Sequence, residues 1–162
     1  MAIKVGDRIP DGTLYKFDEN GVHAVQTADM VDGRKVVVFG LPAAFSRTCS
    51  AAHLPSFMRT REGFAEKGVE DIYCISVNDG FTMAAWDKEM GAGDAGISLL
   101  GDASGEFTKA LGMDFDFPQG GMFGRSKRYA LVAEDGVVTH LNEEVQGGVC
   151  ELTAGEKLLE KL

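Results

Sequence analysis

The feature that most constrains the fold is the apolar run Val36-Val37-Val38-Phe39-Gly40-Leu41, which leads through a loop containing Pro42 into a helical pattern. Consecutive β-branched and aromatic residues with no polar residue between them are typical of a strand buried on both faces. Residues 49–66 then have the spacing of a helix whose apolar side is formed by Leu54, Phe57, Met58 and Phe64. A buried central strand that runs into an amphipathic helix predicts the α/β class.

The rest of the chain continues this alternation. The patterns predict a second core strand, a helix carrying Trp86, a short strand and a short helix at 70–77, 81–90, 97–100 and 106–111. Two hairpins are predicted, one at Asp18-Glu19-Asn20-Gly21 and one with Asp135-Gly136 at its turn. This order predicts a thioredoxin-like fold, with a mixed central sheet flanked by helices and an added N-terminal hairpin, as one domain over residues 1–162.

Two further segments complete the prediction. Residues 114–125 are rich in Gly, Phe and Asp and predict a surface loop, whose aromatic side chains are candidates for the rim of an active site or for a dimer contact. Residues 154–162 predict a final helix, with Thr153 as its N-cap and Leu158, Leu159 and Leu162 facing inward.

Composition restricts the function and the compartment. The 162 residues are 44% hydrophobic and 25% charged, as in ordinary soluble domains. A net charge of −9 disfavours nucleic acid and anionic membranes as partners. Three cysteines do not form a disulfide framework, and no apolar run approaches the ~20 residues of a membrane span. We therefore expect a cytoplasmic protein, or an organellar one if a transit peptide has been removed.

Cys49 lies where the predicted strand–loop–helix unit places a reactive group. The free N–H groups and positive dipole end of a helix N-terminus favour a thiolate. The Ser46 hydroxyl, three residues earlier, could reach the sulfur or a bound substrate, and Pro42 would shield the sulfur from water. The usual fate of a lone cysteine is that of a small buried hydrophobe, but this setting favours a nucleophile.

The segment Gly40–Ser50, followed by His53-Leu54-Pro55, resembles the active-site segment of peroxiredoxins, most closely the peroxiredoxin-5-type or plant type II atypical subfamily. The family pattern Pro-x-x-x-Thr/Ser-x-x-Cys coincides with Pro42, Ser46 and Cys49. The similarity covers nearly the whole chain, including Val5-Gly6-Asp7 with Pro10, Cys74–Asp79, Trp86 and Gly124–Tyr129.

The resemblance implies a peroxidase without cofactor or metal that reduces hydrogen peroxide and small alkyl hydroperoxides. Cys49 would be the nucleophile and become a sulfenic acid. Pro42, Ser46 and Arg128 would bind the substrate, and Arg128 would stabilise the thiolate and the charge that develops on the peroxide oxygens. The neighbouring Lys127 and Arg125 are interpreted as solvated charges. The family also implies a homodimer.

The resemblance leaves the second half of the cycle open. Cys74 matches a cysteine proposed to resolve the sulfenic acid in plant members, and Cys150 lies near the resolving position of animal members. The alternative is an external thiol, such as glutaredoxin with glutathione, or thioredoxin. Pro55 is predicted to kink the helix that begins at Cys49 and to loosen its first turn.

The sequence departs from the subfamily's usual Gly-Ala-Phe-Thr-Pro-Thr-Cys at Ala43, Ser46 and Arg47. Our hypothesis is that Arg47, in place of proline, strengthens the thiolate bias or biases the choice of peroxide. The alternative is a solvent-facing side chain.

Other interpretations remain open at this point. His53 is spaced i, i+4 from Cys49, but two further ligands for a metal are missing, so we expect a polar contact near a dimer surface or a local cap. A peroxide sensor without turnover, or a redox-regulated interaction protein using the same cysteine, is the alternative function. A third class is a purely structural domain.

Overall fold

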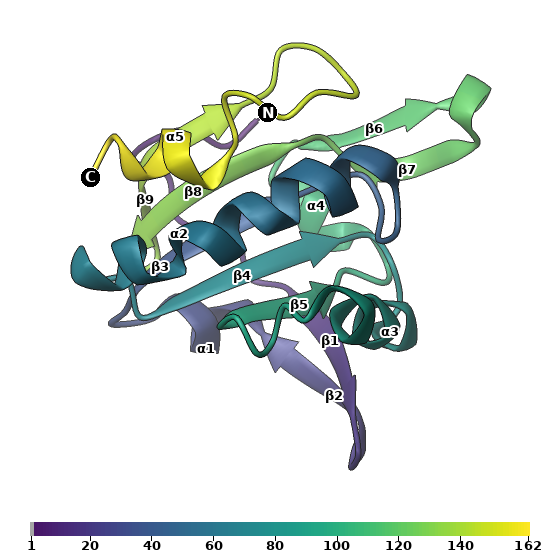
Figure 1. The fold of residues 1–162 in the computed structure, drawn as a ribbon, viewed down its shortest axis with the longest axis horizontal. Coiled ribbons are helices and arrows are strands. Elements are labelled where there is room, and N and C mark those ends of the chain that lie inside the picture. The colour runs from purple at the N-terminus through teal and green to yellow at the C-terminus, as the bar shows by residue number, and fades with distance from the viewer. Residues whose placement is uncertain (1) are drawn as a thin grey trace.

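A seven-stranded sheet organises the molecule, a computed structural model that describes residues 2–162 (Figure 1). Its strand order is β2-β1-β5-β4-β3-β8-β9. The strands are β1 (Thr13–Asp18), β2 (Gly21–Gln26), β3 (Lys35–Gly40), β4 (Asp71–Ser76), β5 (Ile97–Gly101), β8 (Tyr129–Glu134) and β9 (Val137–Glu143). The helices are α1 (Thr27–Val31), the π-turn η1 (Cys49–His53), α2 (Leu54–Glu66), α3 (Gly80–Met90), α4 (Glu106–Ala110) and α5 (Gly155–Leu159).

The centre of the sheet is β3, as the valine run predicts. It pairs parallel with β4 and antiparallel with β8, and β4 pairs parallel with β5, so the sheet is mixed. Side chains alternate between two faces along a strand, and β3 accordingly supplies Val37 and Phe39 to one hydrophobic cluster and Val36 and Val38 to another. Helices α2, α3 and α5 contribute to the first cluster, and α1 and α4 to the second. The predicted thioredoxin-like α/β class is confirmed.

Both predicted hairpins are present. β1 and β2 pair antiparallel up to Asp18 opposite Gly21, and β8 and β9 up to Glu134 opposite Val137. Asp135 and Gly136 have φ values of 48° and 77°, the two positive angles that a tight type I′ turn needs.

The predicted surface loop at 114–125 is wrong. It forms a two-stranded ribbon of β6 (Asp114–Phe117) and β7 (Met122–Ser126), joined by the 3-10 turn η2 (Pro118–Gly120). Asp-Phe-Asp-Phe has the two-residue period of a strand, but the ribbon lies apart from the main sheet and its strands are mostly exposed. It therefore lacks the hydrophobic signal by which buried strands are recognised.

The C-terminal prediction is correct in type and wrong in detail. Helix α5 covers only Gly155–Leu159, and its N-cap is Ala154, without a side-chain cap. The Thr153 hydroxyl donates instead to the Glu144 carboxylate at 2.6 Å. Leu158 is buried, and Leu159 and Leu162 pack against the core as predicted.

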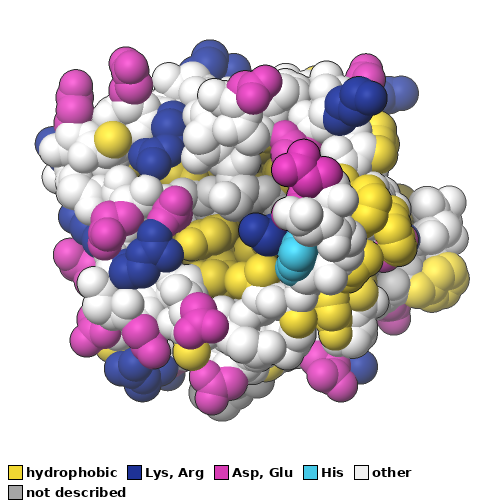
Figure 2. All heavy atoms as spheres, turned by 90° about the horizontal axis from the view of Figure 1, so that it is seen from below, with side chains coloured by type: hydrophobic (Ala, Val, Ile, Leu, Met, Phe, Trp, Pro, Cys, Tyr) yellow, Lys and Arg dark blue, Asp and Glu magenta, His cyan; other side chains and the backbone are white. Residues whose placement is uncertain are grey.

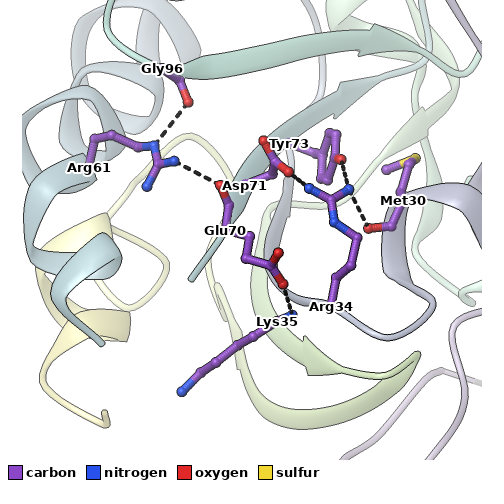
Figure 3. A network of polar contacts seen from close by, with 8 residues as sticks. All are labelled: Met30, Arg34, Lys35, Arg61, Glu70, Asp71, Tyr73 and Gly96. Atoms are coloured by element: carbon purple, nitrogen blue, oxygen red, sulfur yellow. Dashed lines mark hydrogen bonds and ion pairs between the residues drawn. The ribbon is translucent and has the colours of Figure 1, made fainter. Parts of the chain in front are cut away.

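A polar network closes the end of the sheet at which β3 and β4 begin (Figure 3). The Arg34 guanidinium pairs with Asp71 and donates to the Tyr73 hydroxyl, and Arg61 donates to the carbonyls of Glu70 and Gly96. The carboxyl ends of these parallel strands therefore lie at the opposite edge, where sites in open α/β sheets are usually found. Within residues 2–162, no helix is long and apolar enough to cross a membrane.

Candidate active site

Cys49 lies just beyond the carboxyl end of β3, where the chain turns into a helix. Helical structure begins at residue 47, and Cys49 opens a π-turn through His53 before α2 continues from Leu54. The Leu54 N–H donates to the Cys49 carbonyl five residues earlier. The prediction of a regular α-helix from Cys49 is therefore wrong for residues 49–53. This π-helical turn is followed by Leu54 and then by Pro55, which has no N–H to donate.

The Cys49 side chain is fully buried and its sulfur has a cationic partner. The Arg128 guanidinium, at the junction of β7 and β8, lies with Nη2 3.3 Å from Sγ of Cys49 and is itself only 7% exposed. Because β8 pairs with β3, residue 128 is brought to the end of the strand that leads into the cysteine loop (Figure 1). A buried cation at this distance is positioned to stabilise negative charge that develops at the sulfur.

No acidic side chain neutralises this arginine. Within residues 2–162, no carboxylate lies within 4.0 Å of the Arg128 guanidinium. A buried cation without a counter-ion is costly, so the anionic form of Cys49 is its natural partner.

Ser46 and Pro42 shape the opening above the cysteine. The Ser46 hydroxyl donates to the Ala43 carbonyl at 2.9 Å, and the Ser46 carbonyl accepts from the Ser50 N–H at 2.9 Å. The structure therefore does not show the expected hydrogen bond from the Ser46 hydroxyl to the sulfur, because the hydroxyl donates its proton to Ala43 within the loop. Its oxygen keeps lone pairs that can accept a hydrogen bond from a ligand.

The loop between β3 and the helix is held in a strained form. Phe45 has a φ of 65°, a left-handed value unusual for a residue with a side chain. The Ala44 N–H donates to Asn78 Oδ1 at 3.1 Å, and the same oxygen accepts from the Ser76 hydroxyl at 2.6 Å. Anchoring the loop to the end of β4 stabilises the strained turn. Sequence analysis missed Asn78, although Cys74–Asp79 belongs to the resemblance.

A groove opens from the site to the surface. Pro42, Ser46 and Arg128 line it together with Phe115, Phe117 and Met122 of the β6–β7 ribbon and with residues 143–148. Phe115 and Phe117, from the segment expected to supply a rim or a dimer contact, thus line this groove. Exposed Arg47 and Lys127 also lie at this groove.

Arg125 is not the solvated charge that the sequence suggests. It is half-buried, and its Nη1 donates to the Val77 carbonyl at 2.7 Å. The bond ties the β6–β7 ribbon to the segment that follows β4.

His53 is also placed differently from the sequence prediction. It is fully buried, with Nδ1 3.0 Å from Nη1 of Arg128 and Nε2 3.1 Å from the Thr153 carbonyl. Burial, and then the Arg128 charge, hold the pKa of His53 well below its usual value, so the ring is neutral at pH 7. Within residues 2–162, no three His, Cys, Asp or Glu side chains are grouped as a metal site.

The other two cysteines differ sharply from Cys49. All three are free thiols. Cys74 is fully buried on β4, where burial, and then the Cys49 charge, raise its pKa well above the usual range despite Arg128. Cys150 is half-buried with Sγ 3.7 Å from the Thr153 hydroxyl, and desolvation raises its pKa.

Comparisons with known proteins agree with this geometry. The Redoxin family model matches residues 4–158. The chain is 44% identical over 164 residues to "Peroxiredoxin-2E-2, chloroplastic" of Oryza sativa subsp. japonica, covering 99% of this chain and 72% of that protein. It is 41% identical over 163 residues to "Peroxiredoxin-2B" of Arabidopsis thaliana, covering 99% and 98%.

A solved structure is similar over the same extent. The crystal structure of reduced Prx3 from Vibrio vulnificus in complex with H2O2 superposes with a TM-score of 0.91 at 37% identity, covering 98% of each chain. Sequence and fold thus agree over almost the whole length.

Proposed function

The chain belongs to the peroxiredoxin family of thiol-dependent peroxidases, and we propose that its reaction takes place at Cys49, assisted by Arg128, Ser46 and Pro42. The observation that carries this proposal is the 3.3 Å contact between the Cys49 sulfur and the guanidinium of Arg128, a residue that also lines the groove. The guanidinium favours the thiolate before attack and stabilises negative charge on the peroxide oxygens during it.

In the proposed step the Cys49 thiolate attacks one peroxide oxygen in line with the O–O bond. An S–O bond forms as the O–O bond breaks, so the sulfur is oxidised to a sulfenic acid and the peroxide is reduced. The leaving oxygen takes a proton from solvent and departs as water or an alcohol. Ser46 accepts a hydrogen bond from the bound peroxide, and Pro42 limits the access of water.

The proposed substrates are hydrogen peroxide and small alkyl hydroperoxides. The polar end of the groove is supplied by Ser46 and Arg128, and its wall includes Phe115, Phe117 and Met122. An apolar wall beside a polar floor fits a short alkyl group attached to a hydroperoxide.

We propose that an external thiol, glutaredoxin with glutathione or thioredoxin, completes the cycle. A thiol attacks the sulfenic sulfur, releases water and forms a disulfide, and a second thiol then reduces that disulfide. Of the two internal candidates, Cys150 is favoured over Cys74, because Cys74 is fully buried in a central strand and would need local unfolding to move.

The test is peroxide turnover followed by mass spectrometry without reductant. With glutaredoxin and glutathione, or with thioredoxin, the protein is expected to consume many equivalents of peroxide. Oxidation once followed by a stall would instead support a sensor. After one equivalent of peroxide, a Cys49–Cys150 link, a Cys49–Cys74 link or a lone sulfenic acid identifies the group that reacts next.

A homodimer is the proposed assembly. Hydrophobic side chains, some of them in a hollow, are distributed across the underside of the molecule (Figure 2). The exposed residues of the β1–β2 hairpin and α3 include Phe17, Val22 and Phe81, and the rings of Phe17 and Phe81 lie 4.8 Å apart. A second copy covering them would remove this apolar area from water. Sedimentation of Phe81→Glu against wild type tests this, with a shift to monomer expected.

The proposed compartment is a reducing one, either the cytoplasm or the interior of an organelle. Support comes from three unpaired cysteines and from the chloroplastic rice relative. We propose no membrane or nucleic-acid partner, in keeping with the net charge of −9. Imaging of the tagged protein in its source cells tests the compartment.

A further inference from the structure

His53 connects the reactive pair to a distant segment of the chain. We propose that His53 is a positioning residue for the peroxidase reaction: as a neutral ring protonated on Nε2, it holds Arg128 against Cys49 and fastens Arg128 to the segment that carries Cys150. This inference rests on the proposed role of Cys49 and adds a residue to it.

The tautomer of His53 follows from its partners. Arg128 has only donors, so the Nδ1 atom 3.0 Å from its Nη1 must carry a lone pair. The remaining proton is then on Nε2, which donates to the Thr153 carbonyl at 3.1 Å. A protonated ring would turn a hydrogen-bond donor and a positive charge toward the arginine.

The guanidinium geometry makes this contact matter for the sulfur. Arg128 bonds His53 through Nη1 and Cys49 through Nη2, the two terminal atoms of one rigid planar fork. Rotation away from the imidazole would therefore also move Nη2 relative to Sγ. Since no carboxylate within residues 2–162 pairs with Arg128, the imidazole is its one side-chain partner besides the sulfur in this part of the chain.

Five hydrogen bonds join Arg128, His53, Thr153 and Glu144 in a ring. The Glu144 N–H donates to the Arg128 carbonyl at 3.2 Å, and the Glu144 carboxylate accepts from the N–H and hydroxyl of Thr153. The Thr153 carbonyl accepts from His53, and His53 accepts from Arg128. Cys150 lies between Glu144 and Thr153 in the chain. His53 therefore holds both Arg128 and the Thr153 end of the segment that carries Cys150.

The groups that face His53 are few. Its charged or titratable neighbours are Arg128 from the β7–β8 junction and Cys49 from its own turn. Glu144 and Cys150 of the C-terminal segment lie beyond the Thr153 carbonyl. The rings of Phe39 from β3 and Phe57 from α2 pack against the imidazole. Protonation of His53 would put a second cation beside Arg128 with no anion but the thiolate near it. Acid should therefore weaken the hold on Arg128.

The test uses substitutions that restore one arm of the imidazole at a time. Asn places an amide oxygen near the Nδ1 position, Gln places an amide nitrogen near the Nε2 position, and Leu restores neither. Two rates are measured at pH 7: oxidation of Cys49 by hydrogen peroxide in a stopped-flow instrument, and alkylation of Cys150 by iodoacetamide, read by peptide mass spectrometry. His140→Leu, at a partly exposed position on β9, is the matched control.

We expect His53→Leu to slow Cys49 oxidation about 10-fold to 100-fold and to speed Cys150 alkylation several-fold. His53→Asn should recover most of the oxidation rate without protecting Cys150, and His53→Gln should protect Cys150 without recovering the rate. Once the pH is far enough below 6.5 to reach the depressed pKa of His53, the ratio of the His53→Asn rate to the wild-type rate should rise, since only wild type loses its acceptor to a proton.

Equal losses in Asn, Gln and Leu variants would show a packing role only and overturn the inference. So would a ratio of Asn to wild-type rates that stays constant across the pH range in which NMR shows the His53 ring of wild type to protonate. A wild-type oxidation rate in His53→Leu would overturn it as well. A Cys49→Ala variant is run alongside: if it still consumes peroxide, the proposed function fails, whereas if it is inactive and His53→Leu is normal, only the inference fails.

Discussion

Cys49 and Cys74 are two fully buried cysteines in one hydrophobic cluster, yet the charges around them differ. Cys74 points from the middle of β4 into apolar packing, and its burial raises its pKa well above the usual range. Cys49 opens a helical turn and has a guanidinium 3.3 Å from its sulfur. We therefore expect a neighbouring cation and a helical turn, rather than burial alone, to decide the reactivity of the two cysteines.

The largest effect should separate these two cysteines directly. Cys49→Ala should lower peroxide consumption at least about 1,000-fold, because no other thiol of the chain has a cation placed against it. Cys74→Ala should keep the rate of the first oxidation of Cys49 within about twofold, since the alanine only removes a buried sulfur. Stopped-flow oxidation by hydrogen peroxide measures both. Comparable losses in the two variants would show that Cys49 and Cys74 do not differ in their importance for the reaction.

The next effect concerns the cation itself. Arg128→Met should slow Cys49 oxidation and its alkylation by iodoacetamide about 100-fold, since the thiolate loses the one contact with a buried charge that residues 2–162 provide. Arg128→Lys keeps the charge but lacks the fork that reaches both Cys49 and His53, so it should recover the rate only in part. Full activity in Arg128→Met would mean that the helical turn alone activates the sulfur.

Gly40 tests whether the end of β3 positions the arginine. A Cβ added there would lie 2.2 Å from the Tyr129 ring, which is fully buried and adjoins Arg128 in the chain. Gly40→Ala should lower the free energy of unfolding by about 3 kcal/mol and slow Cys49 oxidation as Tyr129 shifts. Gly147→Ala, where the added Cβ meets nothing, is the control. Urea unfolding measures the first effect, and a stable Gly40→Ala protein with normal kinetics would contradict both expectations.

The sequence predicts some parts of the fold and the site better than others. The valine run of β3 was sufficient to predict the fold class, and the Pro42–Cys49 segment, through its resemblance, was sufficient to propose Cys49 as the nucleophile. Cys74 was ambiguous, since a strand cysteine looks the same in sequence whether it is inert or able to move. The structure places it in the core.

The rest depends on contacts between residues that are far apart in the chain. His53 and Thr153 are separated by 100 positions, and neither side chain carries a local signal of its partner. Threonine is a common N-cap residue, but the Thr153 hydroxyl donates to the Glu144 carboxylate instead of capping the helix. The β6–β7 ribbon was missed although Asp-Phe-Asp-Phe alternates, because exposed strands bury too little apolar surface to be told from a loop.

A smaller effect concerns the segment that carries Cys150. Partial burial raises the pKa of Glu144, but hydrogen bonds from Thr153, Leu152 and Glu151 outweigh it, so the net pKa is lowered. Glu144→Gln should therefore cost about 1 kcal/mol of stability at pH 7. A carboxylate with a depressed folded pKa stabilises above its unfolded pKa of about 4.3 and loses that contribution as pH falls through the folded value.

The difference in unfolding free energy between wild type and Glu144→Gln should accordingly shrink below about pH 4.3. Urea titrations at pH 7, 5 and 3.5 measure it, with Glu143→Gln, an exposed neighbour, as the control. A difference that stays constant over this range would show that the loss comes from packing rather than from the charge.

The smallest effect is expected at Arg47, a groove residue that takes no part in the contact between Arg128 and Cys49. The side chain is exposed at the edge of the groove, so its field on Cys49 is screened by solvent and salt. Proline is tolerated at the start of a helix, so Arg47→Pro should fold normally and change the rate with uncharged cumene hydroperoxide less than about twofold.

With a hydroperoxide that carries a carboxylate, Arg47→Pro should lose about threefold at low ionic strength, because a cation at the mouth attracts an anion as it enters. The loss should disappear in 1 M salt, where exposed charges are screened within about 3 Å. Arg47→Gln keeps the backbone and removes only the charge, so it should behave as Arg47→Pro does. If neither variant distinguishes the two peroxides at low salt, Arg47 is a solvent-facing side chain, and the choice of peroxide rests with the residues that line the groove.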